Sequence, residues 1–387
     1  MAKVIVAMSG GLDSSVAAAL LKRAGFGVTG VFMKFWSEPD KNGLVGVGNR
    51  CCSPEAEVRA RKVAKILKIP FYVFNFEKEF KKRIVDYFLT AYKKGITPNP
   101  CVVCNKEIKF GLLLEKVLTL GADFVATGHY AIKEKIENRK QKVEYDISRE
   151  ARYKLLKGRD KEKDQSYFLW MLNQNQLKNI LFPVGDLTKN QVRKLAKKFR
   201  LPVVKTPESM EICFVPADIN DFLKKYLKTK PGPIVEQVHY GARKILIRSN
   251  LRGREMGEHD GLWFYTIGQR KGIKLPGGPY YVLDKDLKKN LLIVTKNEKD
   301  LYKKELVAKN VNWISGKMPK LPLMVKAKIR YSHRSASTKL TQIYTDKSTD
   351  LDRFIKVVFE KPQRAITFGQ SVVFYKGQEL LGGGIIC

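Results

Sequence analysis

The stretch NPCVVCNKEIKF, residues 99–110, contains two cysteines at a spacing that suits sulfur or metal chemistry. Cys101 and Cys104 are separated by two residues, follow an Asn-Pro kink and precede a basic helix that we expect to begin near Asn105. A pair with this spacing can bind a metal ion, cycle between dithiol and disulfide, or present one reactive thiolate with a helper. These residues alone leave all three chemistries open.

A third cysteine, Cys213, lies far along the chain in the apolar stretch SMEICFVP, residues 209–216. A lone cysteine in apolar surroundings is usually inert packing. Cys213 therefore gains meaning only in combination with the CxxC pair and a phosphate-binding loop. Cys51 and Cys52 are adjacent in the chain, a spacing that does not suit tetrahedral chelation, so the sequence offers no evident fourth zinc ligand.

A glycine-rich loop, SGGLDS at residues 9–14, joins an apolar strand at 4–7 to a segment with helical periodicity at 14–24. Two glycines let the backbone approach an anion, and the first N–H groups of the helix are available to bind it. The chain has no GxxxxGK[ST] motif, and GVGNRC at 46–51 lacks the third glycine and the strand-to-helix setting of a dinucleotide fingerprint. The loop predicts a phosphate site of another kind.

The elements that must position these residues alternate between strand and helix. VTGVFM (28–33), FYVFNF (71–76) and DFVATGH (123–129) are strand-like and are separated by helical stretches. The pattern predicts a doubly wound, mostly parallel sheet with a ligand crevice at the carboxyl ends of its strands. Met33 and Gly128 end two of these strands and should lie in the crevice; His129 is expected to be a buried or rim histidine with a partner.

Three domains are expected. Residues 1–216 form the α/β domain, since Cys213 must return to the crevice, and residues 217–283 form a small central α+β unit. After Leu283, short alternating runs such as LLIVT and SVVFY predict a small antiparallel β-barrel over 284–387. The charged stretch from Ile132 to Arg152 is expected to be a surface hairpin or loop.

Composition limits the class of protein. The 387 residues carry a formal net charge of +35, with 44% hydrophobic residues. The chain has no run of about 18 apolar residues, which argues against a membrane span. An apolar strand already begins at Val4, which leaves no room for a targeting peptide, so a cytoplasmic protein is expected. Basic residues spread along the whole chain favour a large folded RNA as partner, although a solvated lysine-rich surface would give the same count.

The loop SGGLDS resembles the pyrophosphate loop of the PP-loop ATPases, which cleave ATP to AMP and pyrophosphate. Further stretches extend the resemblance nearly end to end: MSGGLDSSV, TPNPCVVCNKEIKF, ATGHY, KDQSYFLW, LFPVGDL, ICFVP, TIGQRKG, RYSHR and GQSVVFYKGQELLGGGII. The chain thereby resembles the bacterial-type tRNA-specific 2-thiouridylases. The resemblance implies adenylation of the C2 oxygen of the wobble uridine and its replacement by sulfur, which a donor protein (a cysteine desulfurase or a sulfur relay carrier) supplies.

The resemblance also implies roles for individual residues. Cys104 would be the nucleophile and Cys213 would carry a persulfide. Beyond the resemblance, ordinary thiol–disulfide exchange would leave these two cysteines as a disulfide, and we predict that Asp13 places Mg²⁺. The residues expected to bind ATP are Ala7, Met8, Ser9, Gly10, Gly11, Leu12, Asp13, Ser14, Met33 and Gly128. Those expected to meet the target base are Asn99, Pro100 and Cys101. Those expected to contact the rest of the tRNA are Lys163, Asp164, Gln165, Arg330 and Tyr331. Some members carry Asp at position 101, so an acidic role cannot be assumed for Cys101.

Three alternatives remain at this stage. Cys101, Cys104 and Cys213 could hold a [4Fe-4S] cluster whose open iron binds the sulfur, with the same product. A PP-loop amidating ligase would need neither two distant reactive cysteines nor a basic surface. A zinc-stabilised RNA-binding module would not need the pyrophosphate loop.

Overall fold

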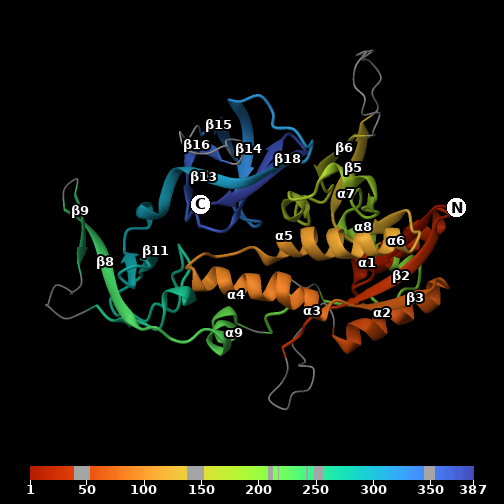
Figure 1. Ribbon diagram of the computed structural model, residues 1–387, viewed down its shortest axis with the longest axis horizontal. Coiled ribbons are helices and arrows are strands. Elements are labelled where there is room, and N and C mark those ends of the chain that lie inside the picture. The colour runs from red at the N-terminus through yellow and green to blue at the C-terminus, as the bar shows by residue number, and fades with distance from the viewer. Residues whose placement is uncertain are drawn as a thin grey trace.

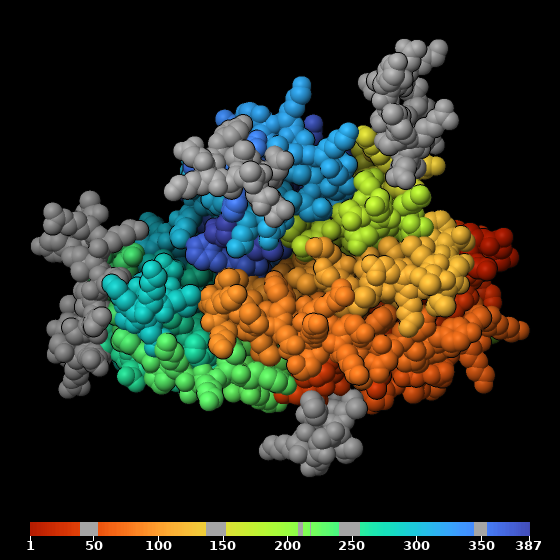
Figure 2. Space-filling view, in the orientation of Figure 1, coloured from red at the N-terminus to blue at the C-terminus, as the bar shows by residue number. Residues whose placement is uncertain are grey.

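The computed structural model describes residues 1–38, 53–136, 152–207, 212–216, 218–240, 243–247, 256–343 and 354–387. The chain builds a parallel sheet with its helices, a small central sheet and a barrel (Figure 1). The three parts lie against one another on the face shown in Figure 2, where the blue barrel and the cyan and green central unit flank the orange helices of the N-terminal part. Within the described ranges, no helix is long and apolar enough to cross a membrane.

The N-terminal sheet has the order β3-β2-β1-β4-β7, and every neighbouring pair is parallel. Its strands are β1 (Lys3–Ala7), β2 (Gly27–Lys34), β3 (Phe71–Asn75), β4 (Phe124–Ala126) and β7 (Ile180–Leu181). The strand order reverses at β1, so the crevice between the carboxyl ends of β1 and β4 is the switch point at which such sheets bind ligands. The predicted doubly wound parallel sheet is confirmed.

Helices cover both faces of this sheet. Val4 and Val6 belong to one hydrophobic cluster, and Ile5 and Ala7 belong to another, because successive strand residues point to opposite faces. Burial on both sides explains the continuous apolar runs in the sequence. The helices of this part are α1 (Leu12–Arg23), α2 (Pro54–Leu67), α3 (Glu77–Phe80), α4 (Asp86–Lys93), α5 (Pro100–Cys104), α6 (Leu113–Thr119), α7 (Gln174–Lys178) and α8 (Lys189–Lys198), with a 3₁₀ turn η3 (Ser166–Leu169).

The helix that carries the CxxC pair contains a π-helical segment. It runs from α5 through η2 (Asn105–Leu112) into α6, and a similar segment, η1 (Lys81–Val85), joins α3 to α4. A Cβ on Gly111 would lie 2.8 Å from the Lys106 carbonyl oxygen, so the wider turn needs glycine there. π-Helical insertions are frequent at functional sites, and this one begins directly after Cys104.

The central unit contains α9 (Ile219–Tyr226) and a sheet of order β10-β8-β12-β11, with β9 paired to β8. The elements are β8 (Gly232–Tyr240), β9 (Arg243–Ile247), β10 (Glu258–His259), η4 (Leu262–Phe264), β11 (Tyr281–Asp286) and β12 (Leu291–Thr295). β12 is the LLIVT stretch, and it pairs with β8 and β11 rather than with a barrel strand. It therefore lies across the boundary expected at residue 283, because a short apolar strand does not reveal which sheet it joins.

The barrel follows η5 (Glu298–Leu301) and has six antiparallel strands in the order β13-β16-β15-β14-β17-β18, closed by pairing of β13 with β18. The strands are β13 (Tyr302–Trp313), β14 (Leu323–Lys328), β15 (Ala336–Gln342), β16 (Ile355–Arg364), β17 (Ser371–Lys376) and β18 (Glu379–Ile386). Closure leaves these strands without an open edge over most of their length. The predicted antiparallel barrel is confirmed.

A hairpin from the N-terminal part extends the barrel sheet. β5 (Ala131–Ile136) and β6 (Arg152–Lys157) pair with each other, and Leu155 and Leu156 of β6 pair with Leu380 and Glu379 of β18. The expected hairpin is confirmed at its base, and residues 137–151 lie outside the described ranges. The main chain of the α/β part is thus hydrogen-bonded to the barrel.

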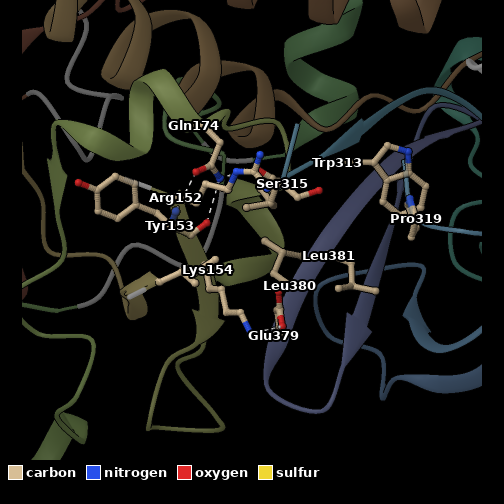
Figure 3. Close-up of a pocket in the computed structure, with 12 residues that line it drawn as sticks. Arg152, Tyr153, Lys154, Gln174, Trp313, Ser315, Pro319, Glu379, Leu380 and Leu381 are labelled. Carbon is tan, nitrogen blue, oxygen red and sulfur yellow. Dashed lines mark hydrogen bonds and ion pairs between the residues drawn. The ribbon is translucent and has the colours of Figure 1, made fainter. Parts of the chain in front are cut away.

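A small, mostly apolar cavity marks this junction (Figure 3). Gln174 spans it, since its Nε2 donates to the Tyr153 carbonyl at 2.9 Å and to the Ile314 carbonyl at 2.6 Å. An ion pair of 3.2 Å joins Lys154 to Glu379 at its rim. None of the residues expected to bind ATP, to contact tRNA or to carry sulfur lines this cavity, so we interpret it as a structural joint.

Candidate active site

The glycine-rich loop forms a cradle at the carboxyl end of β1. Gly10 has φ +71°, and a Cβ there would lie 2.1 Å from the Ala56 carbonyl oxygen, so only glycine fits. The Ser14 hydroxyl accepts from the Ser9 N–H at 3.2 Å, and Arg59 Nε donates to the Gly10 carbonyl at 3.2 Å. α1 begins after Gly11, which has no side chain to cap it. The first-turn N–H groups of α1 therefore suit an anion.

Gly128 completes the cradle from the neighbouring strand. A Cβ on Gly128 would lie 2.6 Å from the Ser14 nitrogen and 2.7 Å from the Asp13 carbonyl carbon, so the backbone after β4 rests against the start of α1. Met33 lies two residues beyond Val31, the β2 partner of Ala7, at the same edge of the sheet. The structure brings the residues expected to bind ATP to one edge of the sheet; that they bind it remains a prediction.

Asp13 is held by two side chains from distant parts of the chain. Lys189 Nζ lies 2.8 Å and 2.9 Å from the two carboxylate oxygens, and the Tyr130 hydroxyl donates to Oδ1 at 2.7 Å. Within the described ranges, no group of three His, Cys, Asp or Glu residues could hold a metal ion. These surroundings do not fit the expected role of Asp13 in placing Mg²⁺, because an ammonium group already neutralises its carboxylate.

Two of the cysteines, Cys104 and Cys213, contact one hydrophobic cluster. Cys104 is 7% exposed and belongs to the cluster that contains Ala7, the last strand residue before the loop. Cys213 is half-buried and packs against the same cluster. The ring of Phe214, the next residue, packs edge-on against Phe88 at 5.2 Å and so anchors this segment. The fold thus joins three sequence motifs that are far apart in the chain.

The three cysteines do not form a metal site in the described part of the chain. Cys101 and Cys104 share helix α5, and Cys213 approaches from a separate segment, yet no three-ligand group results. Cys51 and Cys52 lie outside the described residues.

Asn99 and Pro100 explain where the cysteine helix begins. The Asn99 side chain accepts from the Val102 N–H at 3.4 Å, and Pro100 occupies the first helical position. Both are favoured at a helix start. The helix therefore begins at Pro100, and our expectation of a start near Asn105 is wrong. Cys101 and Cys104 lie inside the helix.

A buried polar side chain follows the nucleophile candidate. Asn105 is 3% exposed, and its Nδ2 donates to the Phe168 carbonyl at 3.1 Å, while its Oδ1 has no hydrogen-bond partner in the described residues.

His129 is also buried and its Nδ1 lies 2.7 Å from the Thr127 hydroxyl. Burial, and then the charge of Lys109, hold the pKa of His129 well below its usual value, so it is neutral at pH 7. It matches the expected buried histidine with a partner.

The residues expected to contact tRNA outside the base pocket are partly engaged by the fold itself. The Asp164 carboxylate accepts from the Gly158 and Ser166 N–H groups, each at 3.0 Å. Gln165 Oε1 accepts from the Tyr130 N–H at 3.0 Å. Lys163 is half-buried on the same loop. A contact of these side chains with tRNA remains a prediction.

Arg330 and Tyr331 lie where the barrel meets the other two parts. The Arg330 guanidinium donates to the Ile267 carbonyl at 3.3 Å in the central unit and to the Thr367 hydroxyl at 2.6 Å in the barrel. The Tyr331 ring packs at 4.6 Å on Phe168, the residue whose carbonyl binds Asn105. Arg330 therefore holds the parts together, and its expected tRNA contact is untested.

Sequence reasoning missed Lys189 and Tyr130. Lys189 belongs to the basic stretch TKNQVRKLAKKF (188–199), whose composition is typical of a solvated or RNA-facing helix, yet Lys189 is only 6% exposed. The signal was local: Thr188 and Gln191 form a capping box, which fixes Lys189 at the first helical position. A lysine is unfavourable at that end of a helix dipole, which hints at another role.

Comparison with known proteins covers nearly the whole chain. Residues 2–217 match the family described as "tRNA methyl transferase HUP domain", residues 220–296 match "tRNA methyl transferase PRC-barrel domain", and residues 303–386 match "Aminomethyltransferase beta-barrel domain". A protein of Clostridioides difficile (strain 630) named "tRNA-specific 2-thiouridylase MnmA" is 44% identical, over 99% of this chain and 98% of its own. "MnmA 2" of Clostridium tetani is 45% identical over 99% and 98%. The protein from Geobacillus thermodenitrificans is 41% identical over 99% and 94%.

Proposed function

This chain belongs to the family of tRNA-specific 2-thiouridylases, and from that premise we propose that it replaces the C2 oxygen of the wobble uridine of tRNA by sulfur, using ATP. The products are 2-thiouridine, AMP and pyrophosphate. The observation that carries the proposal is one hydrophobic cluster that contains Ala7 and Cys104 and against which Cys213 packs. This cluster contains the last strand residue before the glycine-rich loop and is in contact with both of the separate segments that carry Cys104 and Cys213, which supports the proposal.

The glycine-rich loop is suited to the first half-reaction. The C2 carbonyl of uridine is a poor electrophile, so its oxygen must first become a leaving group, and transfer of AMP to that oxygen achieves this. The N–H groups at the start of α1 are available to bind the phosphates of ATP, and such preorganised donors stabilise developing charge. Mg²⁺, arriving with ATP, would neutralise part of the phosphate charge.

The cysteine pair is suited to the second half-reaction. A donor protein loads Cys213 with a terminal sulfur, giving a persulfide. The Cys104 thiolate attacks Cys213 Sγ, the bond to the terminal sulfur breaks, and that sulfur leaves as hydrosulfide. The two cysteines are thereby oxidised to a disulfide while the terminal sulfur is reduced. Hydrosulfide then attacks C2, AMP leaves, and an external thiol must reduce the disulfide before the next turnover.

The iron–sulfur alternative gives the same product by another arrangement of the same cysteines. It needs Cys101, Cys104 and Cys213 to converge on one metal centre, and the described residues contain no such three-ligand group. The persulfide route needs only Cys104 and Cys213 to meet, which their shared cluster favours.

The tRNA substrate accounts for the charge of the chain. A net charge of +35 provides many lysine and arginine side chains that can neutralise tRNA phosphates. Each neutralised phosphate releases condensed counterions from the RNA, which favours binding. A tRNA substrate also leads us to propose that the enzyme works in the cytoplasm.

A series of single Cys→Ser variants tests the mechanism, with thiouridine formation measured by mass spectrometry of digested tRNA. We expect Cys104→Ser and Cys213→Ser to form none, although both still release pyrophosphate, because adenylation precedes sulfur transfer. Cys101→Ser should keep activity within a few-fold of the wild type. Cys387→Ser, which changes an exposed cysteine at the C-terminal end of the barrel, is the matched control and should be fully active. Loss of activity in all three site variants, with iron restoring the apo wild type, would establish the cluster mechanism instead.

A further inference from the structure

A buried lysine lies beside the glycine-rich loop, and the mechanism proposed above assigns it no role. The Lys189 side chain is 7% exposed, and its ammonium contacts both carboxylate oxygens of Asp13, at 2.8 Å and 2.9 Å. The same ammonium lies 5.7 Å from the centre of the Tyr130 ring, and the Tyr130 hydroxyl donates to Asp13. The backbone N–H of Lys189 is fixed as well, donating to Asp160 Oδ2 at 2.8 Å.

The position of Lys189 is costly for the fold. It occupies the first position of α8, where the helix dipole disfavours a cation. Burying an ammonium group carries a desolvation penalty that its partner offsets only in part, and well-packed apolar side chains often stabilise a fold as much as a buried ion pair does. Stability alone therefore does not explain a lysine at this point.

The location of Lys189 relative to the glycine-rich loop suggests a functional reason for its burial. Asp13 is in the first turn of α1, and the Gly128 backbone lies against the Asp13–Ser14 peptide. An ammonium group held by Asp13 is thus at the end of α1 whose N–H groups suit phosphate. A lysine is a compact point charge that binds phosphate oxygens well.

We propose that Lys189 is a further catalytic residue, whose ammonium contacts the phosphates of ATP during adenylation, and that Asp13 and Tyr130 position it. In that step the C2 oxygen of uridine forms a bond to the α-phosphorus, the bond to the bridging oxygen breaks, and pyrophosphate leaves with the electron pair. Lys189 keeps its proton and stabilises the charge on the phosphate oxygens. Asp13 is then a positioning residue for a lysine rather than a ligand of Mg²⁺. The inference rests on the proposed function, in which this loop binds ATP.

The test compares Lys189→Met, Lys189→Arg and Asp13→Asn with the wild type. Lys194→Met is the matched control, because Lys194 is an exposed lysine on the same helix. The measurements are equilibrium binding of ATP and of adenosine, single-turnover release of pyrophosphate in the presence of tRNA, and the Mg²⁺ concentration that gives the half-maximal rate.

We expect Lys189→Met to release pyrophosphate about 10²-fold more slowly or worse, as for loss of one preorganised charge-stabilising group. Its affinity for ATP should fall, while its affinity for adenosine, which has no phosphate, should stay at the wild-type value. Lys189→Arg should retain part of the wild-type rate, and the control Lys194→Met should retain all of it. Asp13→Asn should slow the reaction without changing the Mg²⁺ requirement. If Lys189→Met alone fails to fold, the double variant Asp13→Asn with Lys189→Met, which leaves no buried single charge, should fold and still be slow.

Two results would overturn the inference while the proposed function stands. One is a wild-type rate in folded Lys189→Met. The other is a Mg²⁺ requirement that rises tenfold or more in Asp13→Asn and not in Lys189→Met, which would make Asp13 a metal ligand. A wild-type protein that releases no pyrophosphate with ATP and tRNA would instead overturn the proposed function, and the inference with it.

Discussion

Gly128→Ala offers a sharp test of the predicted ATP site, because one methyl group would press on the part of α1 that receives the phosphates. The added Cβ would lie 2.6 Å from the Ser14 nitrogen, 2.7 Å from the Asp13 carbonyl carbon and 2.9 Å from the Asp13 Cβ. Two of these three atoms are backbone, so no flexible side chain can turn away. The φ angle of Gly128 lies outside the left-handed region, and alanine therefore brings no conformational strain of its own.

The size of the effect follows from these distances. Ordinary van der Waals contact begins at 3.4 Å, so the start of α1 or the strand end must move by about 0.8 Å. Overpacking of this kind costs about 1–3 kcal/mol. For a domain of this size each kcal/mol lowers Tm by about 2–4 °C. A displacement near 1 Å in a catalytic site can cost about 10²-fold in rate, so we expect the rate of adenylation to fall by that order while the protein stays folded at 25 °C.

The assay is tRNA-dependent pyrophosphate release, measured together with ATP affinity and a thermal melt. Gly27→Ala is the control, because its Cβ would meet nothing nearer than 3.6 Å and the residue lies at the far end of β2. It should match the wild type in every measurement. If Gly128→Ala binds ATP and releases pyrophosphate as the wild type does while its Tm falls, the contact is real but the phosphates lie elsewhere, and the assignment of the loop is wrong.

Two further predictions concern charge. The affinity for tRNA should fall about 10³-fold or more between 50 and 200 mM salt, as for at least six phosphate contacts; a flat salt dependence, or equal affinity for polyglutamate, would contradict a tRNA footprint. Burial lowers the pKa of Lys285 from 10.5 to about 8, with its Nζ donating to the Tyr265 carbonyl at 3.0 Å. Between these two pH values the unfolded state binds more protons than the folded state, so the stability of the wild type relative to Lys285→Met should rise with pH. Thermal melts at pH 7 to 10.5 measure this stability difference between the wild type and Lys285→Met. A difference that stays constant or falls as the pH rises would contradict the lowered pKa of Lys285.

The parallel sheet and the barrel could be predicted because their signals are local. Strands buried on both faces give continuous apolar runs, and barrel strands give short alternating runs between turns. The pairing partner of each strand could not be predicted in this way, because it depends on contacts between segments far apart in the chain. LLIVT has the same pattern as a barrel strand yet pairs with β8, and β6 pairs with β18 across more than two hundred residues.

The start of the cysteine helix was mispredicted for a physical reason. An Asn-Pro pair can be a kink ahead of a helix or the start of the helix itself. Here the Asn99 side chain reaches the Val102 N–H, which makes it the cap and places Pro100 at the first helical position. Cys101 and Cys104 are consequently one turn apart on a rigid element, and Cys104 is the last residue before the π-helical segment.

Residue type gives what a side chain can bind, whereas the fold decides what it already binds. Asp13 suits Mg²⁺ by type, and Arg330 suits an RNA phosphate, but in the structure Asp13 contacts Lys189 and Arg330 donates to acceptors in two parts of the chain. The same reasoning limits how the net charge is interpreted. Lys189 is a buried cation and Lys285 a half-buried one, and both have acceptors inside the protein, so they add to the formal charge of +35 while their ammonium groups are engaged within the fold. The number of phosphates obtained from the salt dependence should therefore reflect exposed cations rather than the formal charge of the whole chain.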